Sequence, residues 1–164
     1  MTDQTRVGEL YPTITPYKTD YLSVSGHQIY YELSGNPDGP AALFLHGGPG
    51  GGTSARDRCF FNPDHYRIVL MDQRGSGKSK PNASYDYEGA LFNNSTNYLI
   101  EDIELLRAEL SLDHWQLILG GSWGSTLAVA YAEKYPKQCR QILLRGVFTA
   151  LPDEIDALFQ DGTT

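Results

Sequence analysis

Apolar and polar residues alternate near the start of the chain. From Gln28 to Leu33 every second side chain is apolar, and a shorter run, Tyr21 to Val24, precedes it across Ser25-Gly26. Alternation with a period of two is typical of a strand with one buried face, and a Ser-Gly pair favours a tight turn. The pattern predicts an antiparallel β-hairpin.

Four later runs are short and mainly apolar: residues 41–45, 67–71, 116–119 and 141–144. Each of them ends where a polar or glycine-rich loop begins. Such runs are typical of strands that are buried on both faces, as in a parallel sheet.

Two segments between or after these strands have helical periodicity. Leucine and isoleucine recur at helical spacing over residues 97–110, and the acidic residues among them, including Asp102, are expected on the solvated face. Residues 123–135 form the second predicted helix, which Pro136 ends. The alternation of strands and helices predicts an open α/β sheet with helices on its faces.

The composition is that of a globular chain of about one domain. The 164 residues are 40% hydrophobic and 20% charged, which excludes disorder as the main state. A net charge of -7 without a basic stripe disfavours nucleic acid as a partner. Cys59 and Cys139 have neither zinc nor redox spacing and are expected to be free thiols.

No feature of the sequence indicates a membrane partner or export. The longest uninterrupted apolar stretch, residues 127–132, is far shorter than the roughly 20 residues that span a bilayer. Residues 1–6 are polar and lack the apolar region of a signal peptide. The protein is therefore expected in the cytoplasm.

Glycine gives the first indication of function. Ten of the 17 glycines lie in three windows, at residues 47–52, 75–77 and 120–124. Each window follows a predicted strand, and ligands of open α/β sheets bind outside the carboxyl ends of the strands. The three windows are expected at one rim of the sheet.

The third window reads Gly120-Gly121-Ser122-Trp123-Gly124, a G-x-S-x-G sequence between a strand and a helix. This is the context of a nucleophile elbow, a sharp strained turn that exposes a serine at a helix N-terminus. Glycines two residues before and after the serine let neighbouring chains pass close. Ser122 is the predicted nucleophile, and the Trp123 N–H is the first predicted oxyanion donor.

The first window is the loop His46-Gly47-Gly48-Pro49-Gly50-Gly51-Gly52. In folds with a nucleophile elbow this loop supplies the second oxyanion N–H, for which Gly48 is the candidate because no Cβ obstructs its amide. His46 is interpreted as a residue that orients the loop rather than as a general base. A dinucleotide cradle is disfavoured because G-x-G-x-x-G is not completed.

The second window contains Gly-Lys-Ser at residues 77–79, which resembles the end of a Walker A motif. The position of the opening glycine holds Asp72, whose carboxylate would repel phosphates. Asp72 and Arg74 are expected instead to anchor this loop beneath the rim by charge-assisted hydrogen bonds.

The sequences HGGPGGG, DQRGSGKS and GGSWGS, in this order and at this spacing, resemble those of the proline iminopeptidases, serine peptidases of the α/β-hydrolase superfamily. The resemblance implies a partial α/β-hydrolase core over residues 1–150 and the start of a helical cap domain over residues 151–164. It implies release of N-terminal proline from small peptides through an acyl-enzyme, without metal or cofactor. Ser122 matches the family nucleophile, and Trp123 and Gly48 match its oxyanion donors. No substrate-binding residue is assigned, and the oligomeric state is left open.

A general base is missing from the expected position. In this superfamily the triad acid and histidine follow the serine along the chain, whereas all four histidines here precede Ser122: His27, His46, His65 and His114. The chain is therefore expected to be the N-terminal portion of such a peptidase, unstable and inactive alone. Residues 141–144 would be an exposed sheet edge prone to aggregation.

Two alternative functions stay open. One is another α/β hydrolase, such as an esterase. The other is a non-catalytic module that binds a carboxylate or a partner in the oxyanion pocket, an interpretation favoured by the missing base. A nucleotide-binding protein ranks third.

Overall fold

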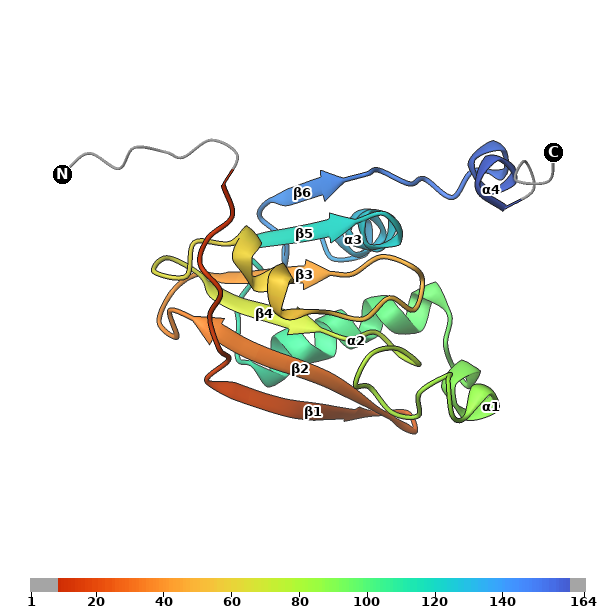
Figure 1. Ribbon diagram of the computed structural model, residues 1–164, viewed down its shortest axis with the longest axis horizontal. Helices are drawn as coiled ribbons and strands as arrows, with labels where there is room; N and C mark the ends of the chain where they lie inside the picture. Colours follow the sequence, from red (N-terminus) through yellow and green to blue (C-terminus); the bar gives the residue numbers. More distant parts are fainter. Residues whose placement is uncertain (1–8, 160–164) are drawn as a thin grey trace.

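The structure is a computed structural model and describes residues 9–159. Six strands form one sheet in the order β1-β2-β4-β3-β5-β6 (Figure 1). The strands are β1 (Lys18–Val24), β2 (His27–Gly35), β3 (Ala41–Leu45), β4 (Arg67–Met71), β5 (Leu117–Gly121) and β6 (Ile142–Arg145). The helices are the 3-10 helix η1 (Ala55–Phe60) and the α-helices α1 (Tyr87–Leu91), α2 (Thr96–Glu109), α3 (Trp123–Lys134) and α4 (Pro152–Phe159).

The predicted hairpin is confirmed. Strands β1 and β2 pair antiparallel up to Val24 and His27, and between them Ser25 and Gly26 have φ values of 43° and 84°. Two positive φ values match a type I′ turn, whose twist suits a hairpin. Strand β2 also pairs antiparallel with β4, while the β3–β4, β3–β5 and β5–β6 pairs are parallel, as predicted for the central strands.

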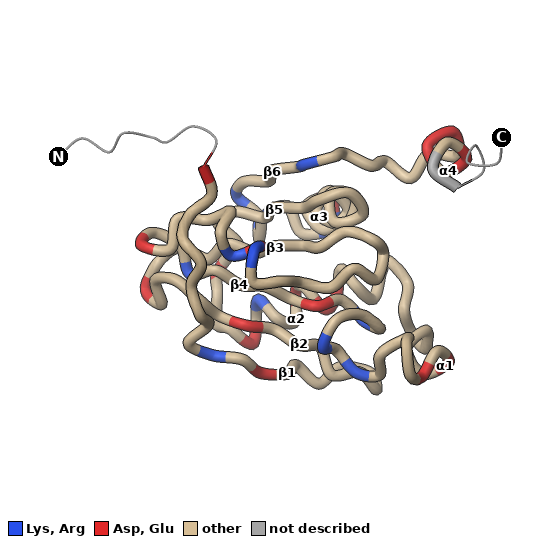
Figure 2. Tube along the Cα trace, viewed as in Figure 1, with Lys and Arg blue, Asp and Glu red and all other residues tan. Residues whose placement is uncertain are grey.

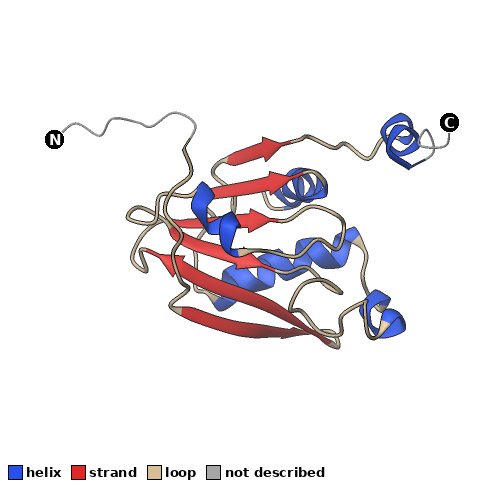
Figure 3. Ribbon diagram, viewed as in Figure 1, coloured by secondary structure: helices blue, strands red, loops and turns tan. Residues whose placement is uncertain are grey.

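The sheet is covered differently on its two faces (Figure 3). Helices α2 and α3 pack on one face, where Leu43 and Leu45 of β3 lie in the larger core cluster. Ala42 and Phe44 of the same strand point to the other face, into a smaller cluster with Phe61, which follows η1. All five residues of β3 are buried, which is why its sequence lacks a polar position.

Strand β6 is the last strand of the sheet, and among the described strands it pairs only with β5. Ile142 and Leu143 are 41% and 49% exposed, although their sequence resembles that of a buried strand. Helix α4 follows β6 and lies apart from the sheet (Figure 1). The division into a core and a cap stays a prediction, and residues 160–164 of that segment lie outside the described residues.

Charged residues of both signs are distributed over the described chain (Figure 2). No helix within residues 9–159 is long and apolar enough to cross a membrane. Cys59 is buried, Cys139 is half-buried, and neither forms a disulfide.

Candidate active site

Ser122 lies in the turn between β5 and α3. Its φ of 53° and ψ of -123° belong to a region that residues with a Cβ rarely adopt, at a cost of about 1–3 kcal/mol. Its N–H donates to the carbonyl oxygen of Arg145 in β6 at 2.9 Å. Ser122 is an exposed residue, and the strained turn places it at the carboxyl ends of the parallel strands.

The flanking glycines are required by close contacts between main chains. A Cβ on Gly124 would lie 2.1 Å from the carbonyl oxygen of Leu45, and one on Gly120 would lie 2.2 Å from the carbonyl oxygen of Gly124. The middle glycine, Gly121, has no neighbour closer than 4.0 Å to such a Cβ. The expected roles of the glycines two residues before and after Ser122 are thus supported by distances.

The glycine loop after β3 lies against this turn. A Cβ on Gly47 would be 3.1 Å from the Cβ of Ser122, and the N–H of Gly51 donates to the carbonyl oxygen of Gly47 at 3.1 Å. Gly48 has a φ of 123°, which glycine adopts readily. The structure therefore brings the loop and the serine together, and Gly48 and Trp123 stay the predicted oxyanion donors.

A cavity of about 310 Å³ opens beside Ser122. Apolar side chains of the sheet and of η1 form much of its lining, together with one acidic and one basic residue. It is lined by Phe44, Gly47, Asp57, Phe60, Leu119, Gly121, Ser122, Arg145 and Gly146. The guanidinium of Arg145 lies 5.5 Å from the ring centroid of Phe60, a cation–π contact.

His46 is buried at the base of the glycine loop and forms hydrogen bonds through both ring nitrogens. Nε2 accepts the Gln73 N–H at 3.0 Å, and Nδ1 lies 2.8 Å from the carbonyl oxygen of Gly47. The main-chain N–H of Gly52 also donates to Nδ1 at 3.2 Å, so His46 contacts the main chain at both ends of the glycine loop. Burial lowers the pKa of His46, in keeping with a neutral ring that orients the loop.

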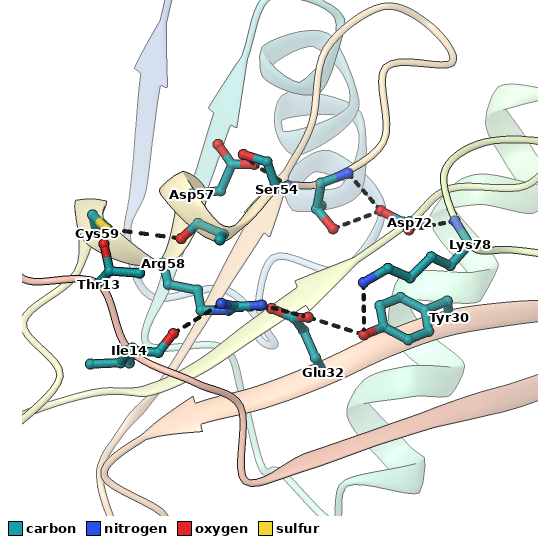
Figure 4. Close-up of polar contacts among 12 residues, drawn as sticks. Thr13, Ile14, Tyr30, Glu32, Ser54, Asp57, Arg58, Cys59, Asp72 and Lys78 are labelled. Carbon is teal, nitrogen blue, oxygen red and sulfur yellow. Dashed lines mark hydrogen bonds and ion pairs between the residues drawn. The ribbon is translucent and has the colours of Figure 1, made fainter.

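Asp72 fixes the far end of the same loop (Figure 4). Its carboxylate accepts hydrogen bonds from the N–H and the hydroxyl of Thr53, at 2.6 and 2.7 Å, and from the N–H of Lys78 at 2.8 Å. A phosphate cradle would need the main-chain N–H of Lys78, which here donates to the carboxylate of Asp72 instead. Asp72 ties the 72–79 loop to the glycine loop, as expected of an anchor.

An ion pair fixes η1, which follows the glycine loop (Figure 4). The guanidinium of Arg58 contacts the buried carboxylate of Glu32 at 2.5 and 3.0 Å and donates to the carbonyl oxygen of Ile14 at 2.9 Å. Glu32 raises the pKa of Arg58. Because two paired charges share several hydrogen bonds, η1 is held against β2.

The expectation that Asp102 is solvated is wrong. Its carboxylate is buried and binds Arg74 at 2.6 and 2.7 Å, and Arg74 also donates to the carbonyl oxygen of Asn93 at 2.8 Å. Burial raises the pKa of Asp102, and the hydrogen bonds from Arg74 oppose that rise. Arg74 thus anchors its loop, as predicted, but its partner is a buried carboxylate of α2 rather than a group beneath the rim.

No histidine in residues 9–159 forms a hydrogen bond with Ser122. His27 binds the carbonyl oxygen of Phe92 and His46 binds its own loop, whereas His65 is exposed on the segment before β4. Within the same residues no group of three or more acidic, histidine or cysteine side chains could hold a metal ion. Residues 9–159 thus provide a serine and nearby main-chain amides without a histidine hydrogen-bonded to that serine.

Comparison with known proteins agrees with this geometry. Residues 40–163 match the family described as alpha/beta hydrolase fold, and the chain belongs to that family. Curated relatives narrow the resemblance to the proline iminopeptidases. The chain is 49% identical to a probable proline iminopeptidase of Leptolyngbya boryana, covering 95% of this chain and 47% of the relative, and 49% identical to a proline iminopeptidase of Arabidopsis thaliana, covering 93% and 39%.

Solved structures have the same fold. A proline iminopeptidase-related protein of Thermus thermophilus aligns with a TM-score of 0.64 at 29% identity, over 77% of this chain and 43% of that one. An epoxide hydrolase of Vigna radiata aligns with a TM-score of 0.68 at 23% identity, over 88% and 46%, and shows the fold alone. The chain spans about half the length of the curated relatives that it matches.

Proposed function

We propose that this chain is the nucleophile-bearing part of a serine peptidase that releases N-terminal proline from small peptides. The observation that carries the proposal is the strained turn at Ser122, packed against Gly47 of the glycine loop. The names of the curated relatives support the substrate class. The proposal needs no particular oligomeric state, and the cytoplasmic location stays a prediction.

The reaction follows from the groups at the turn. The Ser122 oxygen attacks the carbonyl carbon of the N-terminal proline, and the main-chain N–H groups of Trp123 and Gly48 stabilise the oxyanion that forms. The peptide nitrogen leaves with a proton, which produces a prolyl ester on Ser122. Water then hydrolyses that ester and releases proline.

A general base must take the proton of Ser122, because a serine hydroxyl is otherwise a poor nucleophile. No histidine in residues 9–159 is placed for this role. In the proposal the base and its acidic partner lie outside the 164 residues, so the chain alone lacks peptidase activity.

The test is hydrolysis of proline 4-nitroanilide by the protein that contains this chain. We expect turnover, and we expect Ser122→Ala to reduce kcat by at least about 10⁴-fold. Cleavage of 4-nitrophenyl acetate without cleavage of the proline amide would favour an esterase. Absence of both activities, with ligand binding unaffected by Ser122→Ala, would favour a non-catalytic module.

A further inference from the structure

Gln73 lies between the two segments that carry the predicted oxyanion donors. It follows Asp72 at the end of β4, and only 3% of the residue is exposed. Its side-chain N–H donates to the carbonyl oxygen of His46 at 2.9 Å, and its side-chain oxygen accepts the indole N–H of Trp123 at 3.0 Å. One buried amide therefore links the first residue of the glycine loop to the residue after the nucleophile.

The two side-chain partners of Gln73, His46 and Trp123, belong to the segments that carry the predicted oxyanion donors. The carbonyl of His46 belongs to the peptide bond with Gly47, one peptide before the bond that carries the Gly48 N–H, so a hydrogen bond to this carbonyl restrains the start of the glycine loop. Trp123 carries its own main-chain N–H, so its indole bond restrains the residue whose amide would face the oxyanion. A shift of either segment changes the separation between the two donors.

A third hydrogen bond keeps Gln73 itself in place. Its main-chain N–H donates to Nε2 of His46 at 3.0 Å, so His46 contacts both the main chain and the side chain of Gln73. A side chain that satisfies these partners must donate to a carbonyl and accept from an indole at once. Glutamine does so without charge, whereas a glutamate would place a carboxylate oxygen against the carbonyl oxygen of His46.

We propose that Gln73 is a positioning residue that sets the distance between the two oxyanion donors, Gly48 and Trp123. The inference rests on the proposed function, because it assigns Gln73 a part in the same reaction. Gln73 does not touch the reacting atoms, since it acts through the carbonyl of His46 and the indole of Trp123. Oxyanion stabilisation depends on donors fixed before the reaction, and a displacement near 1 Å can cost about 100-fold in rate.

The test compares Gln73→Met, Trp123→Phe and the double variant with a matched control, Gln28→Met. Gln28 is exposed on β2, so its replacement leaves kcat unchanged. Trp123→Phe keeps the main-chain donor and removes only the indole N–H. Each variant is assayed with proline 4-nitroanilide and by the rate at which a fluorophosphonate probe labels Ser122, and its thermal unfolding is measured.

We expect Gln73→Met and Trp123→Phe to lower kcat by about 10- to 100-fold with little change in KM, because the affected interaction acts in the transition state. The double variant should lose far less than the product of the two single losses, since both remove the same link. Binding of a boronic acid analogue should weaken in parallel with kcat, while inhibition by free proline stays the same. A variant that is only less stable would not lose affinity for the boronic acid while its inhibition by proline stays the same.

Several results would overturn the role of Gln73. They are a kcat within twofold of the parent for Trp123→Phe, a change in KM alone, or fully additive losses in the double variant. If the parent labels with the fluorophosphonate but does not cleave the proline amide, the substrate proposal fails and the labelling rates still decide on Gln73. If the parent does neither, both proposals fail.

Discussion

Gly124 is the position at which one added methyl group should disturb the site most. A Cβ there would lie 2.1 Å from the carbonyl oxygen of Leu45 and 2.9 Å from that of His46. Ordinary contact starts near 3.4 Å, so α3 and the end of β3 must separate by about 1.3 Å, the difference between 3.4 and 2.1. Both neighbours are main-chain atoms, which cannot move aside by changing a rotamer.

The expected consequences of Gly124→Ala concern both stability and rate. Overpacking of this kind costs about 1–3 kcal/mol of the free energy of unfolding. A displacement above about 1 Å also moves the glycine loop away from Ser122, which lowers kcat by about 100-fold or more. Denaturant unfolding measures the loss of stability, and hydrolysis of proline 4-nitroanilide measures the loss of kcat. Both assays use one preparation of the protein that contains this chain.

Gly121→Ala is the matched control for stability. Its Cβ would meet no atom closer than the carbonyl oxygen of Arg145 at 4.0 Å, so the free energy of unfolding should change by less than about 0.5 kcal/mol. If Gly124→Ala unfolds at the same denaturant concentration as Gly121→Ala and keeps the parent kcat, the reasoning from close contacts is refuted.

Three further predictions concern strain, pH and the sheet edge. Ser122→Gly should exceed Ser122→Ala in free energy of unfolding by about 1 kcal/mol in urea titrations, since glycine adopts this backbone without strain; equal values would contradict the strain. Because burial lowers the pKa of His46 from its ordinary value of 6.5, its contribution to stability is complete above pH 6.5 and is lost as the pH falls through the lowered pKa. His46→Gln should flatten that part of the stability profile, and His65→Gln should leave it unchanged. Leu143→Lys on β6 should reduce light scattering by the isolated chain, whereas Leu105→Lys on α2, at a residue of nearly equal exposure (48% against 49%), should not.

Local patterns predicted the elements whose burial is regular along the chain. The hairpin at Ser25-Gly26 and the fully buried β3 follow from periodicity and turn chemistry, which act within a few residues. The order of the strands, with β4 between β2 and β3, depends on contacts between distant segments. Helix η1 was also missed, because its six residues have no apolar stripe and are held by the pair between Arg58 and Glu32.

The residues of the site also fall into two groups, those that local sequence predicts and those that depend on contacts between distant segments. Ser122 and its flanking glycines can be read from five consecutive residues, since a nucleophile elbow is a local structure. The residues that fix it, Gln73 and Asp102, bind partners 27 to 50 positions away. Asp102 left a signal that could have been used: it stands three residues after Leu99 and four before Leu106, within the apolar stripe of α2.

The predicted oxyanion donors are main-chain groups of this chain, whereas the proposed general base is a side chain outside it. This difference leads to a last prediction about the isolated chain. The contacts that the structure shows between the glycine loop and Ser122 lie within residues 9–159, so we expect a folded chain to hold the two predicted oxyanion donors in place without a general base. Serine peptidases of other folds that lack a triad member keep about 10³–10⁴-fold acceleration over the uncatalysed reaction, far below that of most complete enzymes.

Such a residual acceleration is too small to give visible cleavage of a proline amide. An activated ester such as 4-nitrophenyl acetate has a better leaving group and should report it as slow turnover. We therefore expect the folded chain to hydrolyse this ester slowly, to lose most of that rate in Ser122→Ala, and to leave proline 4-nitroanilide intact. A folded chain whose ester hydrolysis is the same with and without the Ser122 hydroxyl would mean that the donors are not organised around that oxygen, however close the main chains lie.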